Sequence, residues 1–166
     1  MSNIWFCSDL HFGHKNVQNF RKQFISEADN RHAIKKDWMD NVTKRDVVYV
    51  LGDAAFTMDS VEEFRWLSGR KILVRGNHDK LDTTAYLKHF EQVYGIIKYQ
   101  EFWLSHAPIH PDELRGKVNL HGHTHFHNID DPRYFNCCPE NLWPKYNRCL
   151  VSLDEIRKHY EEMVRV

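Results

Sequence analysis

The sequence predicts a single α/β domain, because short apolar runs typical of buried strands alternate with helical patterns and no linker separates them. The chain has 166 residues, of which 42% are apolar and 28% are charged. This length and composition suit one domain with a proper core. No repeat or low-complexity segment divides the chain. We therefore expect one domain over residues 1–166, with strands and helices interleaved.

Five short apolar runs are predicted strands. They are IWFC (4–7), VVYVL (47–51), KILV (71–74), EFWL (101–104) and KVNL (117–120). Each run is bounded by polar or glycine-containing segments. Nearly continuous apolar runs of this length suit strands that are buried on both faces.

Helical patterns lie between these runs and after them. Between residues 31 and 42 an apolar residue recurs every four positions, which predicts one buried helix stripe. Ser60 with Glu63, and Ser152 with Glu155, have the spacing of capping boxes. Apolar residues follow at helical spacing in both segments, so we expect a helix to begin at each box.

The segment from 130 to 148 shows no regular apolar period. It contains Pro132, Pro139 and Pro144, and proline removes a backbone donor and interrupts regular structure. We expect irregular chain here, with a short strand at YFNC (134–137).

The bulk composition makes several partners less favourable. Lys plus Arg equals Asp plus Glu at 23 each, so no overall positive field would attract nucleic acid or an anionic membrane surface. No run approaches the length of about 18 apolar residues that spans a membrane, and no signal-peptide pattern is present. The four cysteines lack CxxC spacing and are expected to be reduced. We expect a cytoplasmic protein with no membrane partner, for which nucleic acid is a less favoured partner and the oligomeric state is open.

Each predicted strand is followed at once by a cluster that contains Asp, Asn or His. The clusters are SDLH, GD, RGNHD, SHAP and HGHTH, in chain order. In open α/β sheets, the loops at the carboxyl ends of neighbouring strands converge on one crevice. We therefore expect the five clusters to share one site.

Seven side chains in these clusters offer carboxylate, amide or imidazole ligands, with no thiolate among them. They are Asp9, His11, Asp53, Asn77, His106, His123 and His125. Such donors suit Mn, Fe, Zn, Ni or Co. Seven are too many for one tetrahedral ion and suit two ions about 3.5 to 4 Å apart that share a bridging carboxylate. The i, i+2 spacing in GHTH predicts His123 and His125 on the same side of a locally extended backbone, so that each could bind a different ion.

Five sequence blocks resemble those of the calcineurin-like metallophosphoesterases, and they occur in that family's order. The blocks are DxH at 9–11, GD at 52–53, GNHD at 76–79, His106 after a strand, and GHTH at 122–125. One block alone would be weak evidence, whereas five in order are specific. The segment 134–156 also resembles the ending of small bacterial and phage members, and 166 residues leave no room for a capping domain. The resemblance implies a sandwich of β-sheets flanked by helices.

The resemblance also implies a role for each residue of the blocks. It assigns one ion to Asp9, His11, Asp53 and His125. It assigns the second ion to Asp53, Asn77, His106 and His123, so that Asp53 is the bridge. It makes His78 the catalytic histidine that binds no metal, with Asp79 beside it to orient or tune it. Two divalent ions are implied, with manganese favoured. The departures from the family pattern are SHAP in the fourth block, and Cys137 and Cys138 where small or apolar residues are expected.

The function implied by the resemblance is metal-dependent hydrolysis of a phosphoester. A hydroxide that bridges the two ions would attack phosphorus in line, and His78 would stabilise charge or protonate the leaving group. A phosphodiesterase acting on a small or nucleotide-like substrate is favoured. A phosphomonoesterase or a nuclease are the alternatives, and a non-catalytic interaction scaffold is disfavoured because the ligand set is complete. Five nearby residues are left open between substrate contact and loop surface: His14, Arg75, His110, His121 and His127.

Overall fold

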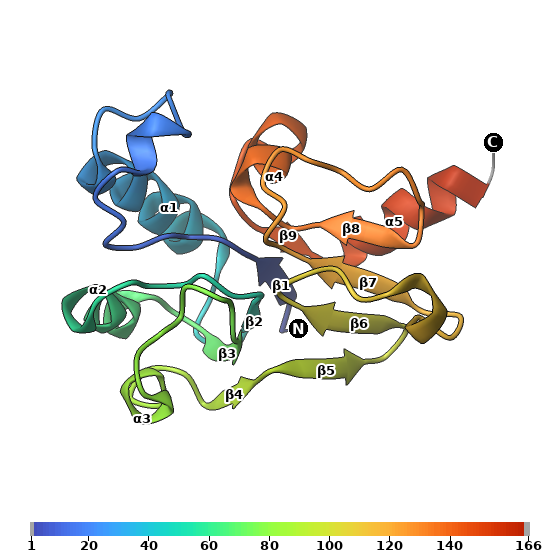
Figure 1. Cartoon of the computed structure of the whole chain (residues 1–166), viewed down its shortest axis with the longest axis horizontal. Helices are drawn as coiled ribbons and strands as arrows, with labels where there is room; N and C mark the ends of the chain where they lie inside the picture. The colour runs from blue at the N-terminus through green and yellow to red at the C-terminus, as the bar shows by residue number, and fades with distance from the viewer. Residues whose placement is uncertain (1, 165–166) are drawn as a thin grey trace.

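Two mixed β-sheets lie at the centre of the molecule, and helices cover them (Figure 1). The computed structural model describes residues 2–164. The first sheet has the order β4-β3-β2-β1-β9 and the second the order β5-β6-β7-β8. The first sheet consists of β1 (Ile4–Cys7), β2 (Val47–Val50), β3 (Arg70–Val74), β4 (Gln92–Tyr94) and β9 (Val151–Ser152). The second consists of β5 (Ile96–Tyr99), β6 (Phe102–Ser105), β7 (Val118–His121) and β8 (Tyr134–Asn136). The predicted α/β sandwich is therefore confirmed.

The strands β1 to β4 are mutually parallel, as are β6 to β8. Strand β9 joins β1 antiparallel, and β5 joins β6 antiparallel. Because the central strands of each sheet are parallel, their carboxyl ends lie along one edge of that sheet.

Both faces of the first sheet are buried, which explains why its strands are apolar without alternation. Trp5 and Cys7 of β1 pack toward the helices, whereas Phe6 between them packs toward the second sheet. Ile34 and Trp38 of helix α1 (Glu27–Asn41) belong to the first of these two core layers. One layer therefore joins the first sheet to its helices, and the other joins the two sheets.

The five predicted strands are present, and the short strand predicted at YFNC is β8. Strands β4, β5 and β9 are additional and were not predicted. All three lie at sheet edges. They span two to four residues, and β4 and β5 are partly exposed along their whole length, so they show no clear apolar run.

The α-helices flank the sheets, and short 3₁₀ turns lie between several of the elements. The first three α-helices pack on the outer face of the first sheet, whereas Leu142 and Ile156 of the last two belong to the layer between the sheets. The α-helices are α1 (Glu27–Asn41), α2 (Met58–Glu62), α3 (Thr83–Tyr86), α4 (Pro139–Tyr146) and α5 (Leu153–Val164). The 3₁₀ turns are η1 (Val17–Asn19), η2 (Glu63–Trp66) and η3 (Pro111–Glu113). Within residues 2–164, none of these helices has the length and apolar character needed to cross a bilayer.

The helix boundaries correct one of the two predicted capping boxes and confirm the other. Helix α2 is capped by Thr57, which exchanges hydrogen bonds with Ser60, so the predicted box of Ser60 with Glu63 is wrong. The box of Ser152 with Glu155 at the start of α5 is confirmed, because each backbone N–H donates to the other side chain. Of the apolar residues that follow this second box at helical spacing, Tyr160 packs against the core, whereas Met163 is 45% exposed.

Helix α4 lies where irregular chain was expected. Pro139 occupies the first turn of this helix, where a backbone donor is not needed. Pro144 lies in the last turn, and the helix ends at Asn147 in the left-handed conformation. The prolines thus mark the two ends of a short helix.

All four cysteines are free and buried.

Candidate metal centre

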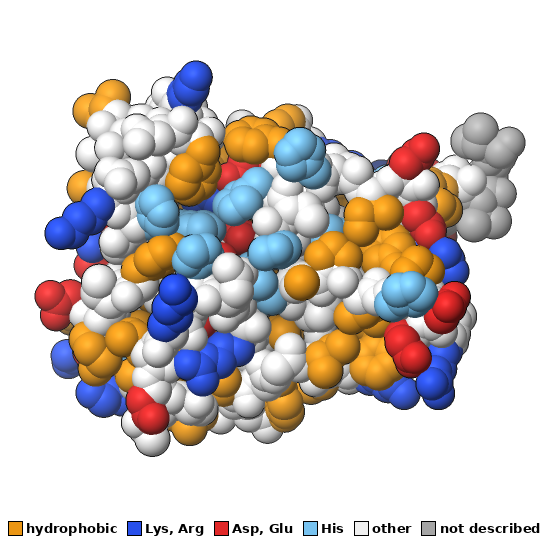
Figure 2. All heavy atoms as spheres, viewed as in Figure 1, with side chains coloured by type: hydrophobic (Ala, Val, Ile, Leu, Met, Phe, Trp, Pro, Cys, Tyr) orange, Lys and Arg blue, Asp and Glu red, His pale blue; other side chains and the backbone are white. Residues whose placement is uncertain are grey.

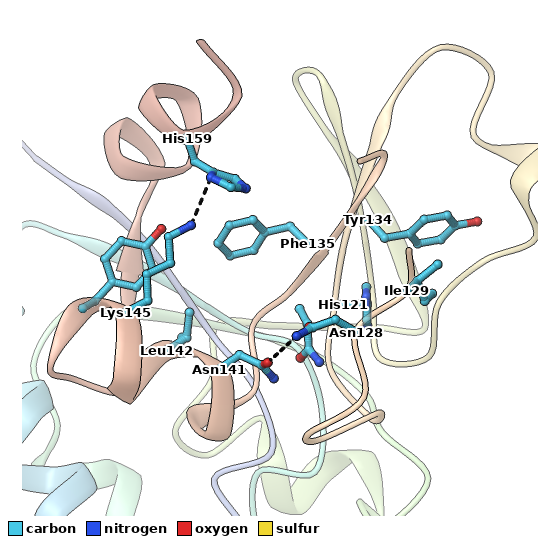
Figure 3. A pocket seen from close by; sticks show the side chains of 11 residues that line it. His121, Asn128, Ile129, Tyr134, Phe135, Asn141, Leu142, Lys145 and His159 are labelled. Carbon is cyan, nitrogen blue, oxygen red and sulfur yellow. Dashed lines mark hydrogen bonds between the residues drawn. The ribbon is translucent and has the colours of Figure 1, made fainter. Parts of the chain in front are cut away.

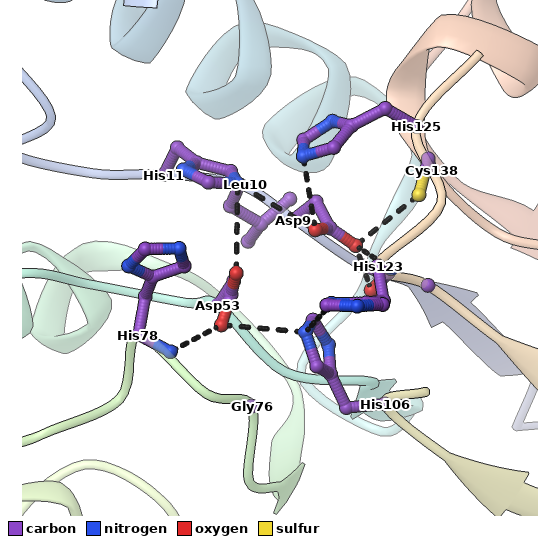
Figure 4. Close-up of polar contacts among 12 residues, drawn as sticks. Asp9, Leu10, His11, Asp53, Gly76, His78, His106, His123, His125 and Cys138 are labelled. Carbon is purple, nitrogen blue, oxygen red and sulfur yellow. Dashed lines mark hydrogen bonds and ion pairs between the residues drawn. The ribbon is translucent and has the colours of Figure 1, made fainter. Parts of the chain in front are cut away.

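The predicted ligands lie just beyond the carboxyl ends of strands from both sheets. Loops after β1, β2 and β3 contribute Asp9, His11, Asp53 and Asn77, and loops after β6 and β7 contribute His106, His123 and His125. Backbone hydrogen bonds join these loops, such as Asp9 N to Gly52 O at 2.9 Å and Gly122 N to His106 O at 2.9 Å. Figure 2 shows the resulting cluster of imidazoles on one face, and Figure 4 shows their contacts. The structure brings all seven predicted ligands together.

Asp9, His11 and His125 form a first set, which we call the inner group. The Asp9 Oδ1 atom lies 3.5 Å from His11 Nε2 and 3.6 Å from His125 Nε2. Asp9 and His11 are almost wholly buried, and His125 is partly exposed. The three side chains therefore offer one oxygen and two nitrogens to a common point.

Asn77, His106 and His123 form a second set, the outer group. Asn77 Oδ1 lies 2.8 Å from His106 Nε2 and 3.1 Å from His123 Nδ1, and the two ring nitrogens are 3.2 Å apart. The other nitrogen of His106 lies 2.9 Å from the Leu51 carbonyl oxygen. A carbonyl only accepts, so His106 Nδ1 carries the proton and its Nε2 lone pair faces the group.

Asp53 lies between the two groups. Its Oδ2 atom is 3.8 Å from His11 Nε2 in the inner group, and its Oδ1 atom is 3.5 Å from His106 Nε2 in the outer group. Each carboxylate oxygen thus faces a different group, which is the arrangement that a bridging ligand requires.

The two oxygens of Asp9 have different surroundings. Oδ2 accepts from the Ser8 hydroxyl at 2.5 Å, from His123 N at 2.9 Å and from the Cys138 thiol at 3.2 Å. Oδ1 accepts no hydrogen bond. Burial alone would raise the pKa of Asp9, but the His11 and His106 imidazoles and the Ser8 hydroxyl outweigh it and hold the pKa well below its usual range. The carboxylate is ionised with one oxygen free.

The donor set fits a divalent ion. Asp9 Oδ1 and both ring nitrogens of His11 are buried without a hydrogen-bond partner, and burying unpaired polar atoms is costly. Burial also lowers the pKa of His11, which favours a neutral ring with a free lone pair. Oxygen and imidazole donors of this kind suit borderline and hard divalent ions.

Five of the seven predicted ligands have a left-handed backbone. The φ angles are 50° at Asp9, 55° at His11, 51° at Asp53, 70° at His123 and 48° at His125. Side chains other than glycine adopt this region at a cost, and such residues cluster at functional sites. The extended backbone predicted for GHTH is therefore wrong. Instead, His123 faces the outer group and His125 the inner group from two successive turns.

Two glycines of the sequence blocks permit close packing between the loops. A Cβ atom at Gly122 would lie 1.7 Å from Ser8 Oγ and 2.2 Å from Asp9 Oδ2. A Cβ atom at Gly76 would lie 2.4 Å from Asp53 N. Any side chain at Gly122 would push the Asp9 loop away.

Arg21 and Glu140 support the inner group, and no sequence pattern points to either residue. The Arg21 guanidinium is fully buried and donates to the Asp9 carbonyl, to Asn30 Oδ1 at 3.1 Å and to Glu140 Oε1 at 2.8 Å. Glu140 Oε1 also lies 3.1 Å from His125 Nδ1. Burial opposes ionisation of Glu140, but His125 and Arg21 outweigh it and lower its pKa to about 2. Such a carboxylate orients a metal-binding imidazole through its second nitrogen.

His78 lies beside the inner group, and Asp79 has contacts other than those expected. His78 N donates to Asp53 Oδ1 at 2.8 Å, and its ring stacks on Phe56 at a centroid distance of 5.0 Å. The Asp79 carboxylate accepts from the backbone N–H groups of Asp53 at 2.8 Å, Ala54 at 2.9 Å and Gly76 at 2.8 Å. Among the described residues, no hydrogen bond joins it to the His78 ring. Asp79 therefore fixes the loops after β2 and β3 and does not orient His78 directly.

His121 does not join the metal cluster, although it precedes GHTH. Its Nδ1 atom lies 2.8 Å from Gly122 O, and the residue lines a separate cavity between β8, α4 and α5 (Figure 3). Asn141 of that cavity donates to the His125 carbonyl. The cavity therefore adjoins the loop that carries His123 and His125, through the contact of Asn141 with the His125 backbone.

The other four residues left open by the sequence have distinct surroundings. His14 packs against Phe56 at 4.8 Å between centroids, and burial lowers its pKa. Arg75 donates to the chain between residues 79 and 83. The His110 side chain is 72% exposed, and His127 is exposed. Of these four, His14 and Arg75 lie near the site.

The comparisons with known proteins agree with this geometry. The calcineurin-like phosphoesterase family profile matches residues 2–160. The chain belongs to this family. This calcineurin-like phosphoesterase is 40% identical in sequence to the gene 66 protein of Mycobacterium phage D29, over 95% of this chain and 96% of that one. It is 34% identical to the gene 66 protein of Mycobacterium phage L5, over 75% of this chain and 78% of that one.

A solved structure also resembles this calcineurin-like phosphoesterase. It is a protein of unknown function from Aquifex aeolicus, with a TM-score of 0.74 and 26% identity, over 95% of this chain and 99% of that one. An uncharacterised protein of Methanocaldococcus jannaschii is 29% identical, over 94% of this chain and 84% of that one. Family membership and the groups of metal-binding side chains point to a metal-dependent phosphoester hydrolase.

Proposed function

We propose that this protein hydrolyses a small phosphodiester with the help of two divalent ions. The observation that supports the proposal most strongly is the arrangement of the inner and outer groups on either side of Asp53. Zero formal net charge favours a small or nucleotide-like ester over nucleic acid. A cytoplasmic location, with manganese as the favoured metal, belongs to the same proposal.

Each group would hold one ion, and Asp53 would bind both. The first ion takes Asp9, His11, Asp53 and His125 as ligands. The second takes Asp53, Asn77, His106 and His123. When bound, such ions lower the pKa of water to near neutrality and offset negative charge on phosphoryl oxygens. Because no thiolate takes part, the site suits manganese, iron, zinc, nickel or cobalt.

His78 acts on the substrate in this proposal and binds no ion. Its backbone N–H is held by Asp53, and its ring is supported by Phe56. The ring in this position would offset charge on the phosphoryl group. It also donates a proton to the departing oxygen as the phosphorus–oxygen bond breaks, and a general acid of this kind contributes about 10²- to 10⁴-fold to the rate.

The test is hydrolysis of bis(p-nitrophenyl) phosphate by the metal-loaded protein. Release of p-nitrophenolate is expected with added Mn²⁺ and is abolished by a chelator. His78→Ala is expected to keep both ions while turnover falls by about 10²- to 10⁴-fold. His32→Ala, at an exposed position on α1, is the matched control. A fully active His78→Ala variant would refute the role of His78, and an inert metal-loaded protein would refute the hydrolase.

A further inference from the structure

An open cleft adjoins the outer group, and His78 is not among the residues that line it. It has a volume of about 540 Å³, and Asn77, His106 and His123 lie at one end of it. Its walls are largely apolar and are formed by Ile96, Ala107, Pro108 and Ile109. A substrate phosphate bound at the outer group would therefore have apolar surface beside it.

Arg75 is the one charged residue that lines this cleft in the described chain, and its guanidinium is already occupied. Nε donates to the Asp79 carbonyl at 2.8 Å, one terminal nitrogen donates to Thr83 Oγ1 at 2.9 Å, and the other donates to the Leu81 carbonyl. The guanidinium also lies over the Tyr86 ring. No uncommitted cation is left in the cleft for a second phosphate or a carboxylate of the substrate.

The cleft is rigid before any substrate arrives. The backbone of Ile109 is held at both ends, because its N–H donates to Asn119 Oδ1 at 3.0 Å and its carbonyl accepts from the Tyr134 hydroxyl at 2.7 Å. The Ser105 hydroxyl donates to the Ala107 carbonyl at 2.7 Å. Walls fixed in this way bind an apolar group without an ordering cost.

We propose that this cleft holds the ester substituent that stays on phosphorus, and that it selects an uncharged, apolar substituent. The inference depends on the proposed function, in which His78 faces the departing oxygen. His78 lies against Phe56 and does not line the cleft, so the retained substituent is the part of a diester that can reach the apolar walls. A monoester leaves the cleft empty, and a nucleic-acid strand would bring the charged phosphate of its next nucleotide there.

The first test compares diesters that share one leaving group. Phenyl p-nitrophenyl phosphate and 4-carboxyphenyl p-nitrophenyl phosphate both release p-nitrophenolate, and they differ only in the charge on the retained ring. The expected kcat/KM for the phenyl ester is at least about 10-fold higher, because ionised carboxylates are costly to move next to apolar surface. Methyl p-nitrophenyl phosphate, which buries less apolar area, is expected to fall below the phenyl ester.

The second test changes the cleft itself. Ile96 is 47% exposed on the edge strand β5, so a lysine there is tolerated by the fold. Ile96→Lys is expected to reverse the preference in favour of the carboxyphenyl ester, while metal content stays unchanged. Ile129→Lys, at an exposed isoleucine outside this cleft, is the control and is expected to keep the wild-type preference.

A binding measurement completes the test without turnover. The methyl(phenyl)phosphinate anion carries both groups on P–C bonds and has no ester bond to hydrolyse. Calorimetry is expected to show that it binds the metal-loaded protein about 10-fold more tightly than the dimethylphosphinate anion. Equal kcat/KM for the phenyl and carboxyphenyl esters, or an unchanged preference in Ile96→Lys, would overturn the inference and leave the hydrolase intact. Absence of hydrolysis of every ester would overturn both.

Discussion

The inner group and the outer group differ in how deeply they are buried and in what holds their side chains. In the inner group, Asp9 and His11 are buried, and the fully buried Arg21 with Glu140 fixes the Asp9 backbone and the His125 ring. In the outer group, Asn77 and His123 are exposed. Under the proposed function, the inner group would retain its ion more tightly and the outer group would meet the substrate.

Asp53→Asn is expected to have the largest effect, because this side chain faces both groups. The variant keeps the shape of the side chain but removes the charge that a bridging ligand supplies. Both ions are expected to bind more weakly, and turnover is expected to fall by at least about 10³-fold. Metal analysis after dialysis, together with the aryl diester assay, measures both effects. A variant that retained the inner ion at full affinity would show that Asp53 serves the outer group alone.

Glu140→Gln is expected to affect the inner group selectively. The amide cannot supply the charge that orients His125 and balances Arg21, so the affinity of the inner ion is expected to fall by about 10- to 100-fold. Calorimetric titration with Co²⁺ resolves the tight and weak binding events. Glu113→Gln, at an exposed glutamate, is the control. A shift of the weak event alone would contradict the difference between the two groups.

Graded removal of metal is expected to separate the groups without mutation. With increasing chelator, the ion of the outer group should leave first, because two of its three side chains are exposed and its affinity is expected to be about 10-fold lower. Turnover should disappear with this first ion while one ion per chain remains. Loss of both ions in a single step would show that the two positions bind with equal strength.

Cys138→Ala is expected to have the smallest effect. The thiol donates one weak hydrogen bond to Asp9 Oδ2, which the Ser8 hydroxyl and His123 N also reach. Its removal should weaken the inner ion by roughly 2- to 10-fold. Cys138→Ser keeps a donor at this position and should bind as tightly as the wild type. Equal weakening in both variants would assign the effect to packing.

The central strands and the seven ligand candidates could be predicted from the sequence because each has a local signal. Strand β1 is a continuous apolar run, and Asp9 follows it within two residues. Edge strands such as β4 have no such run. The capping role of Thr57 has no distinct signal, because Ser60 and Glu63 also have the spacing of a capping box.

The supporting residues could not be predicted because their contacts are made in three dimensions. Arg21 and Glu140 are separated by 119 positions in the sequence and lie in segments with no site motif. The left-handed φ angles at Asp9 and His123 are likewise set by the loops that pack on them. Asp79 was adjacent to His78 in sequence, yet its carboxylate turns to the loop of Asp53.

Strand β1 lies between β2 and β9, and this topology sets the order of events after synthesis begins. Residues 4–7 leave the ribosome early, but their second neighbour is at residues 151–152. Until that segment arrives, β1 keeps an unpaired edge, and the loop with Asp9 and His11 has not yet met Cys138 and Glu140. The nascent chain therefore lacks the complete set of side chains around the proposed ion site. We therefore expect the proposed ions to bind late, after the long-range contacts of the chain have formed.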